Sequence, residues 1–179
     1  MRLFPHSLLD ELAIQAGAGA RRRAHHNVHA APTDAVQRFF VVAHSDAYFR
    51  PHRHSAKSEM ALVLRGRFAV LTFDDAGRLT ARYPVGADQA DMGWEVPRAT
   101  WHTLLALQDG SAFLEIKQGP YDPATASQFA AWAPPEGDPA VPAFLQRLRT
   151  AAVGASLASA QDSAAPESTL SAAGQNGIA

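Results

Sequence analysis

The sequence predicts an all-β fold, a single jelly-roll (double-stranded β-helix) barrel with an N-terminal helix and a disordered C-terminal tail. Short runs of β-type residues follow one another between positions 36 and 118, and turn signals such as the Asp-Asp-Ala-Gly sequence at 74–77 separate them. The chain has 179 residues, which is enough for one domain with a real core and too few for two ordinary ones. A barrel of seven or eight short strands can hold a small ligand in its mouth or interior.

The N-terminal segment, residues 1–30, is predicted to be a helix followed by a connector. Leu8, Leu9, Leu12 and Ile14 form an apolar stripe at helical spacing, and the glycines at 17 and 19 end the helix. Three arginines and two histidines follow at positions 21–26, and we interpret them as a basic connector.

The barrel is expected over residues 31–145. Seven runs have strand character, and they cover residues 36–44, 59–66, 67–74, 78–86, 93–97, 101–108 and 111–118. The Pro-rich stretch 119–142 reads as an irregular strap over the barrel, and a short helix can follow over 141–153.

The last segment, residues 151–179, differs in composition from the rest. Ala, Ser and Gly make up 18 of its 29 residues, and it contains no aromatic residue, Lys or Arg. Such a stretch cannot bury enough apolar surface to offset its ordering entropy, so we expect a disordered tail.

Charge and composition exclude several classes of protein. Sixteen Lys and Arg against 17 Asp and Glu argue against a sequence-independent nucleic-acid binder, which needs a positive excess. No apolar run reaches the length of a membrane span, and the acidic Asp10 and Glu11 are unlike a secretory signal or transit peptide. We therefore expect a cytoplasmic protein whose partner is a small-molecule substrate, with no nucleic acid and no membrane.

Any metal site in this chain must be built from histidines and carboxylates, because the sequence has no cysteine. His52 and His54 are two residues apart, so on an extended strand they project to the same face and form a chelating pair. Glu59 follows across a polar break that can turn the chain back, and Gly66 then ends an apolar strand at a tight turn. His102 enters a later strand after the turn at Pro97.

This arrangement resembles the cupin superfamily. The first cupin motif, H-x-H, three or four residues, E, six residues, G, is filled at every one of these positions by His52, His54, Glu59 and Gly66. The second motif ends in P-x-G-x-x-H, which Pro97 and His102 match. The chain departs from the pattern in three places, with Asp46 and Ala99 where glycines are expected and Ala106 where an asparagine is expected. These departures affect turn geometry and pocket polarity rather than metal ligation.

A narrower resemblance, to the WbuC-type cupin-fold metalloproteins, covers roughly residues 8–145. It is carried by Asn-Val-His at 27–29, Tyr-Phe-Arg-Pro-His-Arg-His at 48–54, Trp-His-Thr at 101–103, Lys-x-Gly-Pro-Tyr at 117–121 and Trp-Ala-Pro-x-Glu-Gly at 132–137. Members of that family occur among genes for bacterial surface-polysaccharide synthesis. The resemblance thus implies polysaccharide biosynthesis as the setting, while it leaves the reaction open.

Three neutral imidazoles and one carboxylate suit one divalent transition metal, Fe, Mn, Ni or Zn, and disfavour Ca and Mg. If the ion is six-coordinate, two positions stay open, which points to catalysis or reversible ligand binding rather than a closed structural site. We predict His52, His54, Glu59 and His102 as the ligands.

Three further residues are candidates for catalysis. Tyr48 and Arg50 share strand parity with His52, so a regular strand would turn them inward, where Arg50 can hold an anionic group and Tyr48 can donate a proton. Arg50 can equally be a rim residue in an ordinary ion pair. Lys117 lies on one face of its strand with Phe113 and Glu115, and this face lines the cavity or is the solvated side of an outer strand.

The histidines at positions 25, 26 and 29 allow two interpretations. They are a solvated basic loop or a second cluster. We expect the loop, although His29 belongs to the family resemblance and can cap the pocket.

Our functional hypothesis is a metal-dependent enzyme of the isomerase or epimerase type acting on a small polar substrate such as a sugar derivative. Two alternatives stay open, an Fe(II)-dependent dioxygenase and a non-catalytic small-molecule or metal-binding sensor. A homodimer that pairs through barrel edges, with the first strand and the N-terminal helix, is also expected.

Overall fold

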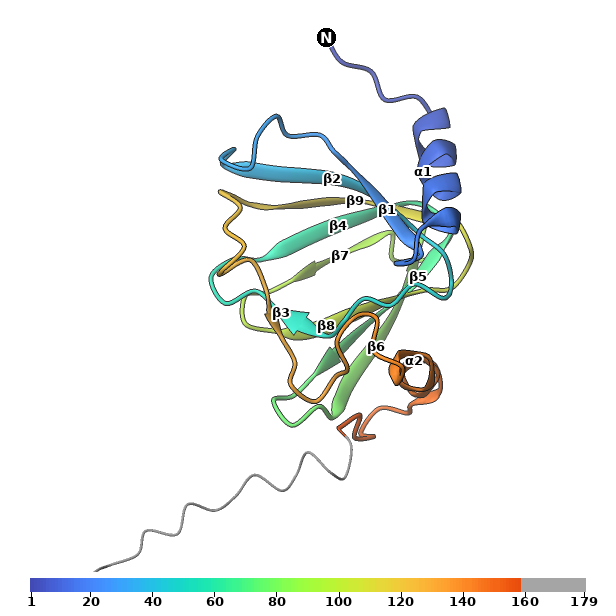
Figure 1. The fold of residues 1–179 in the computed structure, drawn as a ribbon, viewed down its shortest axis with the longest axis vertical. Helices are drawn as coiled ribbons and strands as arrows, with labels where there is room; N and C mark the ends of the chain where they lie inside the picture. Colours follow the sequence, from blue (N-terminus) through green and yellow to red (C-terminus); the bar gives the residue numbers. More distant parts are fainter. Residues whose placement is uncertain (159–179) are drawn as a thin grey trace, which may run out of the picture.

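Two five-stranded antiparallel sheets pack face to face into a jelly-roll barrel (Figure 1). The structure is a computed structural model and describes residues 1–158. The first sheet has the strand order β1-β2-β9-β4-β7, and the second has the order β10-β3-β8-β5-β6. The predicted all-β jelly roll is therefore confirmed.

The elements in chain order are α1 (Ser7–Ala18), β1 (Arg23–Asn27), β2 (Val36–Ala43), β3 (His52–Arg53), β4 (Glu59–Arg65), β5 (Arg67–Phe73), β6 (Leu79–Gly86), β7 (Gly93–Val96), β8 (Trp101–Ala106), β9 (Ser111–Gln118), β10 (Gln128–Phe129) and α2 (Val141–Thr150). All seven predicted strands are present. Among the described residues, no helix combines the length and apolar character needed to cross a membrane.

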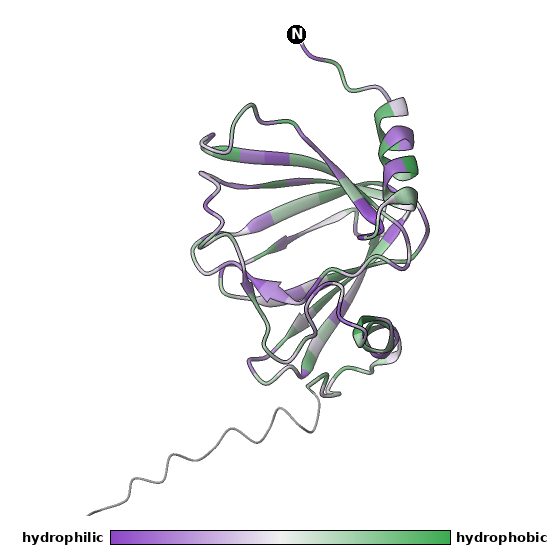
Figure 2. Cartoon of the chain, in the orientation of Figure 1, coloured by the Kyte–Doolittle hydropathy of each residue, from purple (hydrophilic) through white to green (hydrophobic). Residues whose placement is uncertain are grey.

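The barrel interior is divided between a packed core and a cavity. Aromatic rings from both sheets meet in the core, where the centroid of Phe113 lies 5.3 Å from that of Phe68 and 5.4 Å from that of Trp94. The alternation of β4 sends Glu59, Ala61 and Val63 inward, because successive strand residues point to opposite faces. The short strand β3, which carries part of the site, is coloured hydrophilic in Figure 2.

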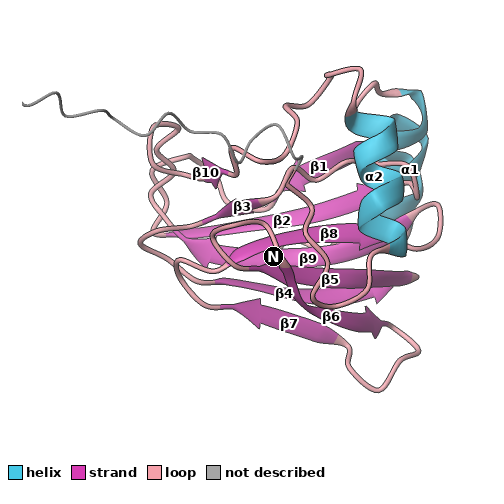
Figure 3. Ribbon diagram, turned by 90° about the horizontal axis from the view of Figure 1, so that it is seen from below, coloured by secondary structure: helices cyan, strands magenta, loops and turns pink. Residues whose placement is uncertain are grey.

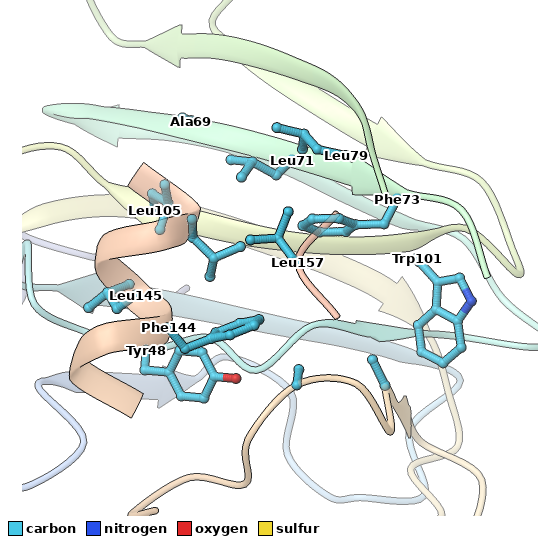
Figure 4. Close-up of a cluster of buried hydrophobic side chains, with 13 residues drawn as sticks. Tyr48, Ala69, Leu71, Phe73, Leu79, Trp101, Leu105, Phe144, Leu145 and Leu157 are labelled. Atoms are coloured by element: carbon cyan, nitrogen blue, oxygen red, sulfur yellow. The ribbon is translucent and has the colours of Figure 1, made fainter. Parts of the chain in front are cut away.

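The two helices cover outer faces of the barrel, and both lie toward the same end of it (Figure 3). Helix α1 packs Leu9 and Leu12 against Val42 and Ala112 of the first sheet. Helix α2 confirms the short helix expected near residue 141, and its Phe144, Leu145 and Leu148 join a buried cluster with Leu71 and Leu79 (Figure 4). Ile14 of the predicted apolar stripe is 73% exposed and contributes nothing to this packing.

Two boundaries differ from the sequence prediction. Part of the segment predicted as a basic connector forms β1, which pairs with β2 from Arg23↔Ala43 to Asn27↔Phe39 and so belongs to the barrel. The tail predicted from residue 151 is packed as far as Leu157, which is 1% exposed and donates its backbone N–H to the carbonyl of Gly77. The remainder of the predicted tail, residues 159–179, lies outside the described residues.

Candidate metal centre

Three histidines and one glutamate converge inside the barrel. The potential ligand atoms of His52, His54, Glu59 and His102 all lie within 4.8 Å of one another. His52 begins β3, Glu59 begins β4 and His102 lies in β8, directly opposite His52 in the strand register. In residues 1–158 no other group of three or more His, Cys, Asp or Glu side chains converges in this way.

The strand geometry explains why these side chains meet. His52 and His54 point into the barrel, whereas Arg53 between them points outward, pairs with Asp75 at 3.1 Å and lies over the Trp101 ring. This is the alternation that the H-x-H spacing predicts. The chain then turns at 55–58 and returns in β4, which brings Glu59 to the same site.

The turn before His102 takes an unusual backbone conformation. Ala99 has a φ of 62°, in the left-handed region that favours glycine, and its N–H donates to the His54 carbonyl at 2.7 Å. It occupies the position where the cupin motif has glycine. The turn therefore keeps the backbone shape of the motif although the residue has changed, and it ties the two metal-binding segments together.

Backbone carbonyls fix the three imidazoles. The Nδ1 atoms of His52 and His102 lie 2.9 Å from the carbonyl oxygens of Arg50 and Thr100, and His54 Nδ1 lies 2.5 Å from that of Ala126. Because a carbonyl oxygen only accepts, each Nδ1 carries the proton, and each Nε2 can offer its lone pair at the centre of the cluster.

The contacts between these side chains fit a bound cation. His54 Nε2 lies 2.9 Å from Glu59 Oε2, so two acceptors face each other unless a proton or a metal ion lies between them. His102 Nε2 is buried, has no hydrogen-bond partner among the described residues, and lies 3.9 Å from Glu59 Oε1. Three imidazole nitrogens and one carboxylate are a donor set typical of divalent transition metals.

The protonation states also favour metal binding. Burial lowers the pKa of His52 to about 3 and lowers the pKa of His102 as well. Burial alone would raise the pKa of Glu59, but the contact with His54 and the charge of Lys117 outweigh it, so the pKa lies below its usual range. Neutral imidazoles and an ionised carboxylate are the forms that ligate metals.

A cavity of about 480 Å³ opens beside this centre, and His52 and Glu59 form part of its wall. Aromatic side chains cover much of the remaining wall, namely those of Phe39, Phe49, Phe113, Tyr121 and Phe129. Such a volume suits a small molecule that lies with one end near the metal centre.

Two charged residues of β9 link the cavity to the metal centre. Lys117 Nζ lies 2.5 Å from Glu115 Oε1 and 3.4 Å from Glu59 Oε2. Burial and the nearby charge of Glu59 raise the pKa of Glu115 to about 7. Burial disfavours the charged form of Lys117, but the two carboxylates raise its pKa above the usual range. Lys117 is therefore a cation held between two carboxylates.

The other two catalytic candidates, Arg50 and Tyr48, lie in different environments. Arg50 lines the cavity, whereas Tyr48 packs beside Phe144 of α2, with ring centroids 6.1 Å apart (Figure 4), and donates its hydroxyl to the Pro134 carbonyl at 2.9 Å. Burial raises the pKa of the Tyr48 hydroxyl. The expected inward parity of Tyr48 fails because residues 48–51 are not in a strand.

Sequence reasoning underrated two parts of this site. The sequence leaves the face of Phe113, Glu115 and Lys117 open between cavity and solvent, and the structure places all three side chains in the cavity lining. The expected solvated loop is wrong for His25, which lies on β1 and lines the cavity, whereas the buried His29 lines the cavity in agreement with its expected place at the pocket.

A family model described as a domain of unknown function (DUF6016) matches residues 4–85. No curated protein matches the chain.

Several solved structures resemble the chain. KdgF from Halomonas sp. is 19% identical, with a TM-score of 0.45, over 57% of this chain and 82% of that protein. CapF, a capsular polysaccharide assembling protein from Staphylococcus aureus, is 18% identical in its complex with an inhibitor, with a TM-score of 0.50, over 61% of this chain and 32% of CapF. A variant of oxalate decarboxylase from Bacillus subtilis is 22% identical, with a TM-score of 0.47, over 61% and 28% of the two chains. The CapF likeness supports the cupin fold, and none of these findings bears on the WbuC-type resemblance.

Proposed function

We propose that this cupin is a divalent-metal-dependent enzyme that isomerises or epimerises a small hydroxylated substrate such as a sugar derivative. His52, His54, Glu59 and His102 would hold the metal, with Fe, Mn, Ni and Zn as candidates. A bound metal of this kind supplies Lewis-acid stabilisation of negative charge on a substrate oxygen. The resemblance to WbuC-type proteins supports a setting in surface-polysaccharide metabolism.

The observation that carries this proposal is the Glu115–Lys117 pair beside the metal centre. Isomerisation or epimerisation by proton transfer removes a proton from one substrate carbon and returns one to the neighbouring carbon or to the opposite face of the same carbon. It needs no outside oxidant or reductant. A carboxyl group with a pKa of about 7 is close to equally populated as acid and base at neutral pH, which suits both transfers.

Lys117 positions this carboxyl group. Its ammonium contacts Glu115 and Glu59 at once, so it holds the Glu115 side chain toward the metal centre. It also supplies a positive charge that favours a developing oxyanion in the cavity. Lys117 thus supports the proton transfer without being its base.

The aromatic lining of the cavity supports the proposed proton transfer. Phe39 contacts the Lys117 ammonium face-on, with Nζ 5.4 Å from the ring centroid, and Phe49 and Phe113 also line the cavity. An apolar lining strengthens electrostatic interactions within the cavity and limits the access of water to a reactive intermediate.

The experiment is solvent-deuterium incorporation into a panel of aldoses, ketoses and sugar phosphates, measured by NMR with protein of known metal content. We expect incorporation into a substrate of the wild type and a loss of at least ~100-fold in Glu115→Gln. Glu11→Gln, at an exposed position on α1, is the matched control and should exchange like wild type.

Three results would contradict the proposal. Exchange that persists in Glu115→Gln would remove the proposed base. Oxygen consumption that depends on added Fe(II) would identify a dioxygenase. Tight binding of a panel member without chemical change would identify a sensor.

A further inference from the structure

Arg50 differs from the other cations of the cavity. Arg21 and Arg23 both pair with Glu136, and Lys117 pairs with Glu115 and Glu59. Within residues 1–158, Arg50 forms no ion pair with any carboxylate. A guanidinium that faces a cavity without a counter-charge is suited to bind an anion that enters from solvent.

The guanidinium is already oriented. Its NH2 group donates to the Ala130 carbonyl at 3.0 Å, and its Cζ lies 5.2 Å from the centroid of the Phe129 ring. The Nε atom is buried and has no hydrogen-bond partner among the described residues. A desolvated N–H without an acceptor is costly, and a ligand oxygen would satisfy it.

Arg50 also lies next to the metal centre. Its carbonyl accepts the hydrogen bond from His52 Nδ1 at 2.9 Å, and both side chains line the cavity. Arginine and lysine side chains in the lining number four, against three glutamates, so the cavity favours an anion even before a metal is added.

We propose that Arg50 binds the anionic oxygens, carboxylate or phosphate, of a small hydroxylated substrate whose remaining oxygens face the metal centre. The orientation of the remaining oxygens toward the metal centre rests on the proposed function, whereas the binding of the anionic oxygens by Arg50 does not. The guanidinium is a binding group for the substrate, while Glu115 moves the proton.

The test is isothermal titration calorimetry of metal-loaded and metal-stripped protein with three probes, glycolate, inorganic phosphate and neutral ethylene glycol. In Arg50→Gln we expect the affinity for the preferred anion to fall about ten- to a hundredfold, with unchanged metal content. Arg53→Gln is the matched control, because Arg53 lies on the opposite face of the same segment and pairs with Asp75. Whether glycolate or phosphate binds more tightly to the wild type identifies the anion.

The outcomes separate this proposal from the proposed function. Equal anion affinity in wild type and Arg50→Gln, or equal binding of ethylene glycol and glycolate, would overturn the anion site and leave the metal chemistry untouched. A protein that binds no metal but still loses anion affinity in Arg50→Gln would keep the anion site and overturn the metal-dependent function.

A second, independent observation concerns the outer face of the first sheet. Arg38, Ile116, Met60 and Glu95 are direct neighbours on β2, β9, β4 and β7 and form one row across that face. The next row holds the partly buried Leu114 and Leu62, and also Phe40, which packs against Phe4 (ring centroids 5.1 Å apart) and the α1 cluster. The face therefore carries an apolar centre between a cation and an anion.

This row is self-complementary. A two-fold axis parallel to the strands, between β9 and β4, reverses the order of the row, so Arg38 of one copy meets Glu95 of the other. Neither side chain forms an ion pair among the described residues, and both are exposed. We infer that a second copy of this chain packs on this face, rather than on the barrel edge that the sequence suggests.

Charge reversal tests this interface by sedimentation equilibrium. The wild type should exceed the 19.1 kDa of one chain, Arg38→Glu and Glu95→Arg should each dissociate at least tenfold more readily, and the double variant should recover. Arg78→Glu, at an exposed position before β6 in the second sheet, is the control and should leave the assembly unchanged. A wild-type monomer, or a dimer whose dissociation is unchanged by either charge reversal, would overturn the inference.

Discussion

The two walls of the cavity are held in place by different kinds of contact. The metal wall consists of His52, His54, Glu59 and His102. Each of its three imidazoles is fixed by a backbone carbonyl, and two of these carbonyls lie within two residues of their histidine. On a second part of the wall, the arginine wall formed by Arg21, Arg23 and Glu136, both arginines are paired with the Glu136 side chain, more than 100 residues away in the chain, and Arg23 also donates to the Tyr48 carbonyl. The first wall depends on local strand geometry, and the second depends on ion pairs that only the complete fold creates.

This difference has a consequence for stability and function. Backbone contacts hold a ligand set in one geometry at little entropic cost, which suits a metal centre. Ion pairs between side chains are weaker and depend on exposure. Damage to the metal wall should therefore abolish metal binding, whereas damage to the arginine wall should leave it intact.

The largest expected effect is the loss of metal on the metal wall. His52→Ala combined with His102→Ala removes two of four ligands, and we expect metal content to fall from near one equivalent to less than a tenth of that. Elemental mass spectrometry on protein purified without chelators or a metal-binding tag measures this. His26→Ala, which removes a histidine outside the cluster, should retain the metal. Equal metal in both variants would contradict the assignment of the ligands.

The next largest effect is a loss of stability when the arginine wall is damaged. Glu136→Ala leaves Arg23, whose side chain is 13% exposed, without its carboxylate, and should lower the free energy of unfolding by about 1–2 kcal/mol. The partial exposure of Glu136 keeps the value below that of a fully buried pair. Urea unfolding measures the change, and Asp88→Asn, which breaks an exposed pair with Arg67, is the control with little effect. A loss of metal in Glu136→Ala would show that the walls are not independent.

The contrast between the walls also explains which features of the site and fold could be predicted from the sequence. The metal ligands follow from the spacing of His52, His54 and Glu59, because strand alternation and a short turn act locally. The run of Arg and His at 21–26 predicts a solvated connector, because the contacts that make it strand β1, its pairing with β2 and its ion pairs with Glu136, join segments that no local pattern connects. Leu157 shows the same limit, since its Ala- and Ser-rich surroundings predict disorder, but a pocket beside α2 buries it.

The pH dependence of stability tests the raised pKa of Glu115 on β9. The pKa of Glu115 is raised to about 7, so the folded protein holds this proton more tightly than the unfolded chain does. The resulting stabilisation is present below the ordinary pKa of 4.5 and is lost as the pH rises through about 7. Relative to wild type, metal-stripped Glu115→Gln should therefore gain stability in urea unfolding between pH 5 and pH 8. The same relative stability at both pH values would contradict the raised pKa, and Glu11→Gln, at an exposed position on α1, should show no such change.

The smallest expected effect probes the backbone of the metal wall. Ala99 holds a φ of 62°, a conformation that costs an L-residue roughly 1–2 kcal/mol, while glycine adopts it freely but loses more entropy on folding. The two contributions oppose each other, so Ala99→Gly should raise the free energy of unfolding by only about 0.5–1 kcal/mol, with metal content unchanged. Ala87→Gly, at an exposed position with ordinary φ, should not stabilise the protein. If Ala99→Gly destabilised the protein, the alanine would contribute packing that outweighs its backbone conformation, and its replacement of the motif glycine would reflect that packing.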